Sequence, residues 1–232
     1  MSKEREKQIL EILLKEKKVT VGGLAATLFV SEPSVRRDLQ SLEKQHLIKR
    51  THGGAILEEG TLSQNKIPFL LREYEQSGAK AKIAQKASLL IRDNDVIFLD
   101  ASTSCYTLIP FLAARRNLTV ITNGVKALTA LSEYGIRTVS TGGTLLPDCL
   151  ALVGEEAQRT VESYNADLAF FSCRGVSEDG YLTDISPEEN NVRRNMIRHA
   201  KRAYLLCAAN KLGKRYFHNL CHKSDVTDVI TE

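Results

Sequence analysis

The sequence has no apolar stretch that approaches the roughly 20 residues needed for a helix to cross a membrane. It also shows no secretory signal, because the opening residues MSKEREKQIL are charged and contain no apolar core. The chain of 232 residues has no internal repeat and no low-complexity tract. These absences predict a globular, cytoplasmic protein with no membrane partner.

Cysteine is scarce and is poorly arranged for a disulfide framework or a metal site. The five cysteines are odd in number, lie far apart and include no C-x-x-C pair. His199, His218 and His222 also lack the spacing of metal ligands. The pattern predicts reduced thiols in a protein core, and neither a metal nor a cofactor.

Excess positive charge is confined to the start of the chain. Residues 1–50 contain 11 Lys and Arg against 7 Asp and Glu, whereas residues 51–232 contain 21 of each. The net charge of +4 therefore belongs to the first fifth of the sequence. A small basic module beside a larger neutral one predicts an anionic partner for the module.

Residues 1–57 are predicted to form three short helices and a two-stranded hairpin, which is the order of a winged helix-turn-helix. Thr20 and Ser31 suit the N-cap positions of the second and third helices, and Pro33 suits the first turn of the third. The segment LIKRTHGGAIL indicates two strands around Gly53-Gly54. The apolar residues at helical spacing, which we expect to be buried, are Ile9, Ile12, Leu13, Leu24, Ala25, Leu28, Val35, Leu39 and Leu42.

This arrangement would present the third helix to the major groove of DNA and the hairpin to the backbone or the minor groove. The residues expected to contact DNA are Ser31, Ser34, Arg36, Arg37, Lys49, Arg50 and His52. The same pattern also fits a helical interaction module with a solvated charged face, and the residues alone leave both interpretations open.

Residues 58–78 are predicted to be a polar connector with one apolar group, and residues 79–232 an effector-sensing α/β domain with a mostly parallel sheet. The expected strands are VIFL, LTVIT, IRTVST, DLAFFS and RAYLLC, with VTDVIT as a candidate last strand. The expected helices are AKIAQKASLLI, SCYTLIPFLAA, VKALTALSE, LVGEEAQRTVESY and PEENNVRRNMIRHA. The alternation of strand and helix carries the prediction.

Five strands are each followed by a small polar or glycine-containing loop. Ligands bind at the carboxyl ends of parallel strands, and Ser, Thr and Gly donors near helix starts suit a phosphate. Each loop alone is also explained as a helix cap, and Asp100 as a carboxylate that fixes its own loop. The candidate effector-binding residues are Asp100, Ser102, Thr103, Ser104, Thr122, Asn123, Thr141, Gly142, Gly143, Arg174 and Lys211.

The segment VSEPSVRRDLQSLEKQHLIKRTHGGAI resembles the amino-terminal signature of the DeoR family of bacterial transcriptional regulators. The match joins the helix core Arg36-Arg37-Asp38-Leu39 to a wing that ends Arg50-Thr51-His52-Gly53-Gly54-Ala55. Pro68, Phe69 and Arg72 also match a family element. The sequence departs at Gln45-His46, where the family usually has a glycine in the turn before the wing.

The rest of the chain is similar to the DeoR-type effector domain, whose fold resembles ribose-5-phosphate isomerases, glucosamine-6-phosphate isomerases and CoA transferases. The resemblance implies a homo-oligomer, a dimer or tetramer, that represses carbohydrate metabolism genes and binds a phosphorylated sugar. The loop Ala208-Ala209-Asn210-Lys211 lacks the usual acidic residue, and Ala101-Ser102 stands where a glycine is common. The matching positions are Asp100, Ser102 to Ser104, Thr122, Asn123, Gly142, Gly143, Gly154, Asp167, Gly175, Gly180, Glu189, Lys211 and Gly213.

Two other functions stay open at this point. A sugar-phosphate isomerase would need a positioned carboxylate base, and the available candidates are Asp100, Asp184, Glu188 and Glu189. No tight pair of carboxylates is expected among the loops. A protein-interaction module with a vestigial pocket is the third interpretation. We expect a regulator without catalysis, in which Asp100 orients a sugar hydroxyl and residues 102–104 bind the phosphate.

Overall fold

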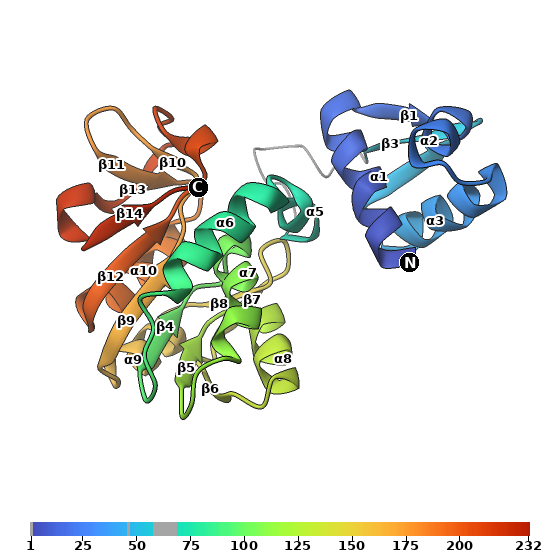
Figure 1. Ribbon diagram of the computed structural model, residues 1–232. Helices are drawn as coiled ribbons and strands as arrows, with labels where there is room; N and C mark the ends of the chain where they lie inside the picture. Colours follow the sequence, from blue (N-terminus) through green and yellow to red (C-terminus); the bar gives the residue numbers. More distant parts are fainter. Residues whose placement is uncertain (1, 46, 58–68) are drawn as a thin grey trace. The chain divides into compact units, whose positions relative to one another are not determined.

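The computed structural model describes residues 2–45, 47–57 and 69–232 of the chain. They belong to two compact units, Met1–Glu75 and Gln76–Glu232, shown in Figure 1. Of the predicted connector, residues 58–68 lie outside the described residues, and so does His46 of the departure before the wing. The described part of the connector contains a short helix, α5 (Phe69–Tyr74), and the start of the next helix.

The first unit combines helices with a small antiparallel sheet. Its other elements are α1 (Ser2–Glu16), β1 (Lys18–Thr20), α2 (Val21–Leu28), α3 (Glu32–Lys44), β2 (Ile48–Thr51) and β3 (Gly54–Leu57). The strand order is β1-β3-β2, so the predicted hairpin gains a third strand that was not predicted. Ile9, Leu24, Leu39 and Leu71 lie in one apolar core, and Leu71 brings α5 into it. The winged helix-turn-helix prediction is confirmed.

Two short-range contacts shape this unit. The Thr20 hydroxyl accepts a hydrogen bond from the Gly23 N–H at 3.0 Å, which is the predicted N-cap of α2. Thr51 pairs with Gly54, so the hairpin turn is His52-Gly53 and Gly54 is the first residue of β3. A Cβ at Gly54 would lie 2.0 Å from the Val19 carbonyl oxygen. The close approach of β1 to β3 therefore requires glycine there.

The second unit contains a six-stranded parallel sheet of order β14-β12-β9-β4-β5-β6. Its strands are β4 (Val96–Leu99), β5 (Thr119–Thr122), β6 (Arg137–Ser140), β9 (Ala166–Phe171), β12 (Ala200–Leu206) and β14 (Asp228–Ile230). The longer helices are α6 (Ser77–Ser88), α7 (Thr103–Leu112), α8 (Val125–Glu133), α9 (Glu155–Glu162) and α10 (Pro187–Arg198). The predicted α/β fold with a mostly parallel sheet is confirmed.

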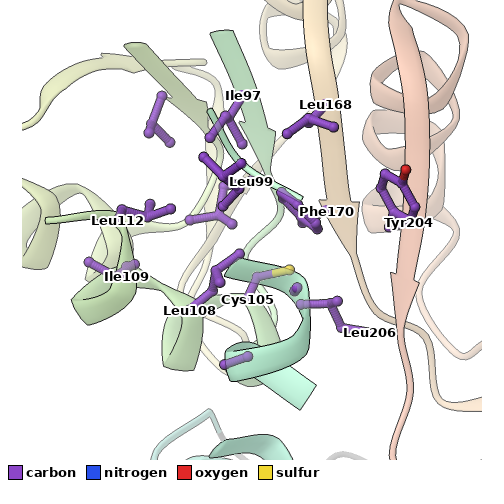
Figure 2. Close-up of a cluster of buried hydrophobic side chains, with 14 of the residues drawn as sticks. Ile97, Leu99, Cys105, Leu108, Ile109, Leu112, Leu168, Phe170, Tyr204 and Leu206 are labelled. Atoms are coloured by element: carbon purple, nitrogen blue, oxygen red, sulfur yellow. The ribbon is translucent and has the colours of Figure 1, made fainter. Parts of the chain in front are cut away.

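Two apolar clusters lie on opposite faces of this sheet. Along β4, Ile97 and Leu99 enter one cluster, whereas Phe98 enters the other. The first cluster packs the sheet against α6, α7 and α8, and Figure 2 shows Cys105 and Leu108 of α7 in it. The second packs the sheet against α9 and α10. The three layers leave the carboxyl ends of the strands as the place where polar loops meet.

The sequence prediction missed several short strands. These are β7 (Thr144–Leu146), β8 (Ala151–Val153), β10 (Gly175–Val176), β11 (Tyr181–Asp184) and β13 (His218–His222). β8 corrects the predicted helix LVGEEAQRTVESY, because the helix itself begins at Glu155. Gly154, with φ of 95°, separates the strand from the helix. Two 3-10 turns, Ala209–Lys211 and Lys223–Asp225, complete the unit. No described helix is long and apolar enough to cross a membrane.

Candidate functional site

The helix α3 packs one face on the core and turns the other outward. Val35, Leu39 and Leu42 are buried, whereas Arg36 and Arg37 are exposed. The short turn between α2 and α3 and the i, i+3, i+4 spacing of the apolar residues produce this division. The exposed face is therefore the one on which the sequence placed its DNA contacts.

Ser31 precedes the first residue of α3, as predicted, but its hydroxyl does not cap the helix. The Ser31 carbonyl accepts from the N–H groups of Ser34 and Val35, while the Ser31 and Ser34 hydroxyls pair with each other at 3.0 Å. Both hydroxyls thus lie at the amino end of α3. Arg36 pairs with Glu32 at 3.0 Å, and both side chains are about half exposed. An exposed pair of this kind contributes about 0.5 kcal/mol or less, so it leaves Arg36 free to bind elsewhere.

Asp38, the acidic residue of the Arg-Arg-Asp-Leu core, faces inward. It is buried and pairs with Arg5 of α1 through two contacts, one of them Arg5 Nη2 to Asp38 Oδ1 at 3.0 Å. The hydrogen bond from Asp38 raises the pKa of Arg5 above its ordinary value. Asp38 therefore holds α1 against α3 and orients the arginines beside it.

The wing carries the remaining predicted DNA contacts. Lys49 and Arg50 lie on β2 and His52 lies in the hairpin turn, and all three are exposed. The Arg50 N–H donates to the Glu43 carboxylate at 2.9 Å, which ties the wing to the end of α3. The seven predicted DNA-contacting residues thus all lie on the outside of the unit or at the amino end of α3.

The loop after β4 is organised around Asp100. Asp100 is 1% exposed, and its Oδ1 accepts from the Ser102 N–H at 2.9 Å. Its Oδ2 accepts from the Ser172 N–H at 3.2 Å, which joins this loop to the one after β9. Ser102 then caps α7, because its hydroxyl accepts from the Cys105 N–H at 3.2 Å. Asp100 has both oxygens engaged within the protein, so its contacts support the loop-fixing role.

Arg193 of α10 is the centre of a buried ionic cluster that the sequence analysis did not identify. Its side chain is 4% exposed. Three carboxylates surround its guanidinium, which donates to Asp100 at 2.8 Å, Asp184 at 2.9 Å and Glu189 at 3.0 Å. It also donates to the Asn190 side chain at 3.2 Å. The expectation that no carboxylates would meet near the loops is therefore wrong, because α10 places an arginine that neutralises three of them.

Charge pairing decides the ionisation of this cluster. Burial alone would raise the pKa of Asp100, but the Arg193 charge and the hydrogen bonds from Ser102 outweigh it and hold that pKa below its ordinary value. Burial likewise opposes the charge on Arg193, yet Glu189, Asp184 and Asp100 keep its pKa well above the ordinary value. Asp100 is thus held as a carboxylate and is a poor proton donor or acceptor.

Lys211 and Arg174 extend the cluster toward the last loop. The Lys211 ammonium donates to the Ser172 hydroxyl at 2.9 Å and to the Cys173 carbonyl at 2.8 Å. Arg174 lies 3.9 Å from Asp184. At the departure Ala208-Ala209-Asn210, the Ala209 N–H donates to the Glu232 carboxylate at 3.0 Å. An ammonium has three N–H donors, so Lys211 retains one beyond these two contacts.

The loop after β5 contains an unsatisfied buried acceptor. The Thr122 hydroxyl accepts from the Gly124 N–H at 3.0 Å, and Asn123 Nδ2 donates to the Leu152 carbonyl at 3.1 Å. Asn123 Oδ1 is buried and has no hydrogen-bond partner among the described residues. A Cβ at Gly124 would lie 3.1 Å from the Ala101 Cα, so this loop touches the loop after β4. A hydroxyl of a small ligand would satisfy Asn123 Oδ1.

The loop after β6 is tied to its neighbour through the backbone. The Thr141 N–H donates to the Thr122 carbonyl at 3.1 Å, and the Gly142 N–H donates to the Ser140 hydroxyl at 3.2 Å. Gly142 and Gly143 have φ of 66° and 103°, which favours glycine. The structure thus joins the predicted effector loops into one contiguous edge of the sheet.

Other polar groups lie away from this edge or are inert. A hollow of about 380 Å³, which includes Arg115 and Arg137 in its lining, lies at the amino ends of β5 and β6, opposite the loops. Burial raises the pKa of the Cys173 thiol to about 12, which makes it a poor nucleophile. Among the described residues, no group of His, Cys, Asp and Glu is arranged to hold a metal ion.

Family models match both units of the chain. The DeoR-like helix-turn-helix domain matches residues 5–61, and the DeoR C terminal sensor domain matches residues 75–232. The chain belongs to the DeoR family of transcriptional regulators. The resemblance carried by the Arg-Arg-Asp-Leu helix and the His-Gly-Gly-Ala wing is thereby confirmed.

Named DeoR-family relatives align along nearly the whole chain. The uncharacterized HTH-type transcriptional regulator YulB of Bacillus subtilis is 34% identical over 99% of this chain and 88% of its own length. The HTH-type transcriptional repressor GlcR of the same organism is 35% identical, with the same coverage. The L-fucose operon activator of Escherichia coli is 30% identical over 100% of this chain and 96% of its own.

Solved structures support the fold. Translation initiation factor eIF-2B of Pyrococcus horikoshii aligns with a TM-score of 0.51 at 14% identity, over 100% of this chain and 89% of that one. Ribose 5-phosphate isomerase of Methanocaldococcus jannaschii aligns with a TM-score of 0.45 at 20% identity, over 59% of this chain and 54% of that one.

Proposed function

We propose that this DeoR-family regulator is a cytoplasmic, sequence-specific DNA-binding repressor of sugar metabolism genes. Its affinity for DNA is changed by a phosphorylated sugar bound at the carboxyl ends of β4, β5, β6, β9 and β12. The observation that carries the proposal is the outward face of α3, where Arg36 and Arg37 are exposed while the opposite face is packed. The exposed basic residues of the wing lie on the same unit and support it.

The proposed DNA contacts divide by chemistry. Arginine suits guanine edges or phosphates, whereas the hydroxyls of Ser31 and Ser34 suit either bases or phosphates. Lys49, Arg50 and His52 on the wing suit the backbone. The buried Arg5–Asp38 pair would keep α3 in position for this contact.

The proposed effector site uses three features of the loops. The first-turn N–H groups of α7, at Thr103 and Ser104, favour a phosphate because they point along the helix dipole. Lys211 offers its remaining N–H donor to the same anion. Asn123 Oδ1 would accept from a sugar hydroxyl. The proposal replaces Asp100 with Asn123 as the group that orients the hydroxyl, since Arg193 already engages Asp100.

GlcR is named a repressor and the E. coli relative an activator, so the direction of regulation needs its own test. Isomerisation is disfavoured because a base must accept a proton, and Arg193 holds Asp100 as a carboxylate of low pKa. Measuring turnover of the sugar phosphate that binds would decide this point. Conversion of that sugar at a steady rate would favour an enzyme.

The proposal is tested by fluorescence anisotropy with DNA from upstream of the protein's own gene. Protein is titrated first, and a panel of sugar phosphates with the matching free sugars is then added. Specific binding that one phosphorylated sugar changes and its free sugar does not would support the proposal. Binding no tighter than to random DNA would contradict it for this promoter.

Matched variants locate the two sites. We expect Arg37→Ala to weaken operator binding by about 5- to 150-fold, the range for an arginine contact to a base. Asn123→Ala should weaken the sugar phosphate and leave DNA binding without effector unchanged. Arg137→Ala, in the hollow at the opposite end of the strands, is the control and should change neither.

A further inference from the structure

Phe29 is a large apolar side chain that packs on nothing in its unit. It is 95% exposed and occupies the turn between α2 and α3. Its neighbour Val30 joins the apolar core, whereas the Phe29 ring does not. An aromatic side chain in water gains none of the free energy that burial would give it.

The backbone of Phe29 is also unfavourable for its residue type. Phe29 is the C-cap of α2 with φ of 53° and ψ of 44°, and its N–H donates to the Ala25 carbonyl. This left-handed conformation usually belongs to glycine or asparagine, and a bulky residue there is strained. Glycine would satisfy the turn without strain and without an exposed ring. Phe29 is therefore poorly explained by the stability of the unit.

The position of Phe29 suggests what the ring contacts. It lies two residues before Ser31, whose hydroxyl pairs with that of Ser34 at the amino end of α3. In a helix-turn-helix, the amino-terminal residues of the recognition helix reach the base edges of the major groove. The C5-methyl group of thymine is the apolar feature of those edges.

We propose that Phe29 is a specificity-determining residue that packs its ring against a thymine methyl group in the operator. This inference rests on the proposed placement of α3 in the major groove. The ring adds an apolar contact beside the polar contacts of Ser31, Ser34 and Arg37. Strain at residue 29 is then retained because the contact improves discrimination between sequences, a pattern common at functional sites.

The test uses the duplex that the wild-type full-length chain selects most tightly from a randomised pool. Each thymine is replaced in turn by deoxyuridine, which lacks only the methyl group. We expect wild-type affinity to fall by about fourfold to tenfold at one position of each half-site, the size expected for a buried methyl. Phe29→Ala should bind the unmodified duplex more weakly by a similar factor and should not respond to deoxyuridine at that position.

Stability gives a second, opposite readout. Phe29→Gly relieves the left-handed strain, so the melting transition that operator DNA shifts should rise by about 3 to 6 °C. Phe29→Ala keeps a Cβ in that conformation and should gain less. Both variants should lose the same operator affinity. A variant that melts higher yet binds DNA more weakly separates a DNA contact from a structural role.

Controls distinguish failure of this inference from failure of the proposed function. Phe217, 76% exposed in the sensor unit, is the matched aromatic, and Phe217→Ala should leave operator binding unchanged. If Arg37→Ala weakens binding but Phe29→Ala does not, the DNA interface stands and the inference is wrong. If neither variant matters, α3 does not enter the groove. Phe29→Ala that changes only the mass measured by light scattering would assign the ring to a second copy and overturn the inference.

Discussion

At the scale of single residues, Arg193 connects more of the effector edge than any predicted residue does. It binds carboxylates from the loop after β4, from β11 and from its own helix. Removing one partner of a buried ion pair leaves uncompensated charge, which costs about 3–5 kcal/mol. We expect Arg193→Met to destabilise the sensor unit by that amount in urea unfolding.

The control for Arg193 is another arginine on a helix with an i, i+4 partner. Arg159 pairs with Glu155 at 3.0 Å, and both side chains are largely exposed. Arg159→Met should change the free energy of unfolding by about 0.5 kcal/mol or less. Equal effects of the two substitutions would show that the Arg193 cluster does not hold the loops together.

The same cluster predicts how stability depends on pH. The folded-state pKa of Asp100 lies below its ordinary value of about 4, so unfolded chains bind more protons in acid. The stabilisation is therefore complete above about pH 4 and is lost as the pH falls through the lower folded-state pKa. Asp100→Asn should unfold with a shallower loss of stability between pH 5 and about pH 2. Equal slopes for the variant and the wild type would contradict this.

The sequence could not predict the Arg193 cluster. Arg193 and Asp100 are separated by 93 residues, and only the fold brings α10 to the end of β4. The available signal was weak: Val192 and Met196 define the buried face of α10, and Arg193 adjoins it. By contrast, the exposed arginines of α3 followed directly from the spacing of Val35, Leu39 and Leu42, because helical periodicity is a local property.

At the scale of elements, the strands of the parallel sheet were predictable because each is a short apolar run followed by a polar loop. β8, β10, β11 and β13 were not, since their stability depends on pairing with partners elsewhere in the chain. The turn of the wing was misplaced by one residue for a similar reason. Its register is set by β1, which packs against Gly54.

Two glycines of the DNA-binding unit should respond oppositely to alanine. Gly54→Ala brings a Cβ to 2.0 Å from the Val19 carbonyl, so we expect a loss of about 1–3 kcal/mol in unfolding free energy. A Cβ at Gly22, in α2, would meet only the Glu32 carboxylate at 3.7 Å. Gly22→Ala should stabilise the unit by about 0.5–1 kcal/mol, because alanine is the better helix former. Denaturant melts of the two variants would check both signs, and destabilisation by both would contradict the assignment of Gly22 to an open helix surface.

At the scale of the whole molecule, a regulator needs its two ligands to favour different states. The proposed homo-oligomer fits this requirement, because operators with two half-sites match a protein with twofold symmetry. Light scattering of the free chain and of its complex with the selected duplex would test the oligomer. The effector then acts only if it binds the DNA-competent state more weakly than the other state.

Thermodynamic linkage makes that requirement measurable. If the sugar phosphate weakens operator binding by some factor, the operator must weaken sugar phosphate binding by the same factor, typically about 5- to 150-fold. Titration calorimetry with and without saturating operator duplex should return equal factors from both directions. Asn123→Ala should lower sugar phosphate affinity in both titrations, because its unpartnered Oδ1 lies in the sensor unit and touches no DNA. A sugar phosphate that binds equally well with and without operator would be a ligand of the site but not the signal that controls DNA binding.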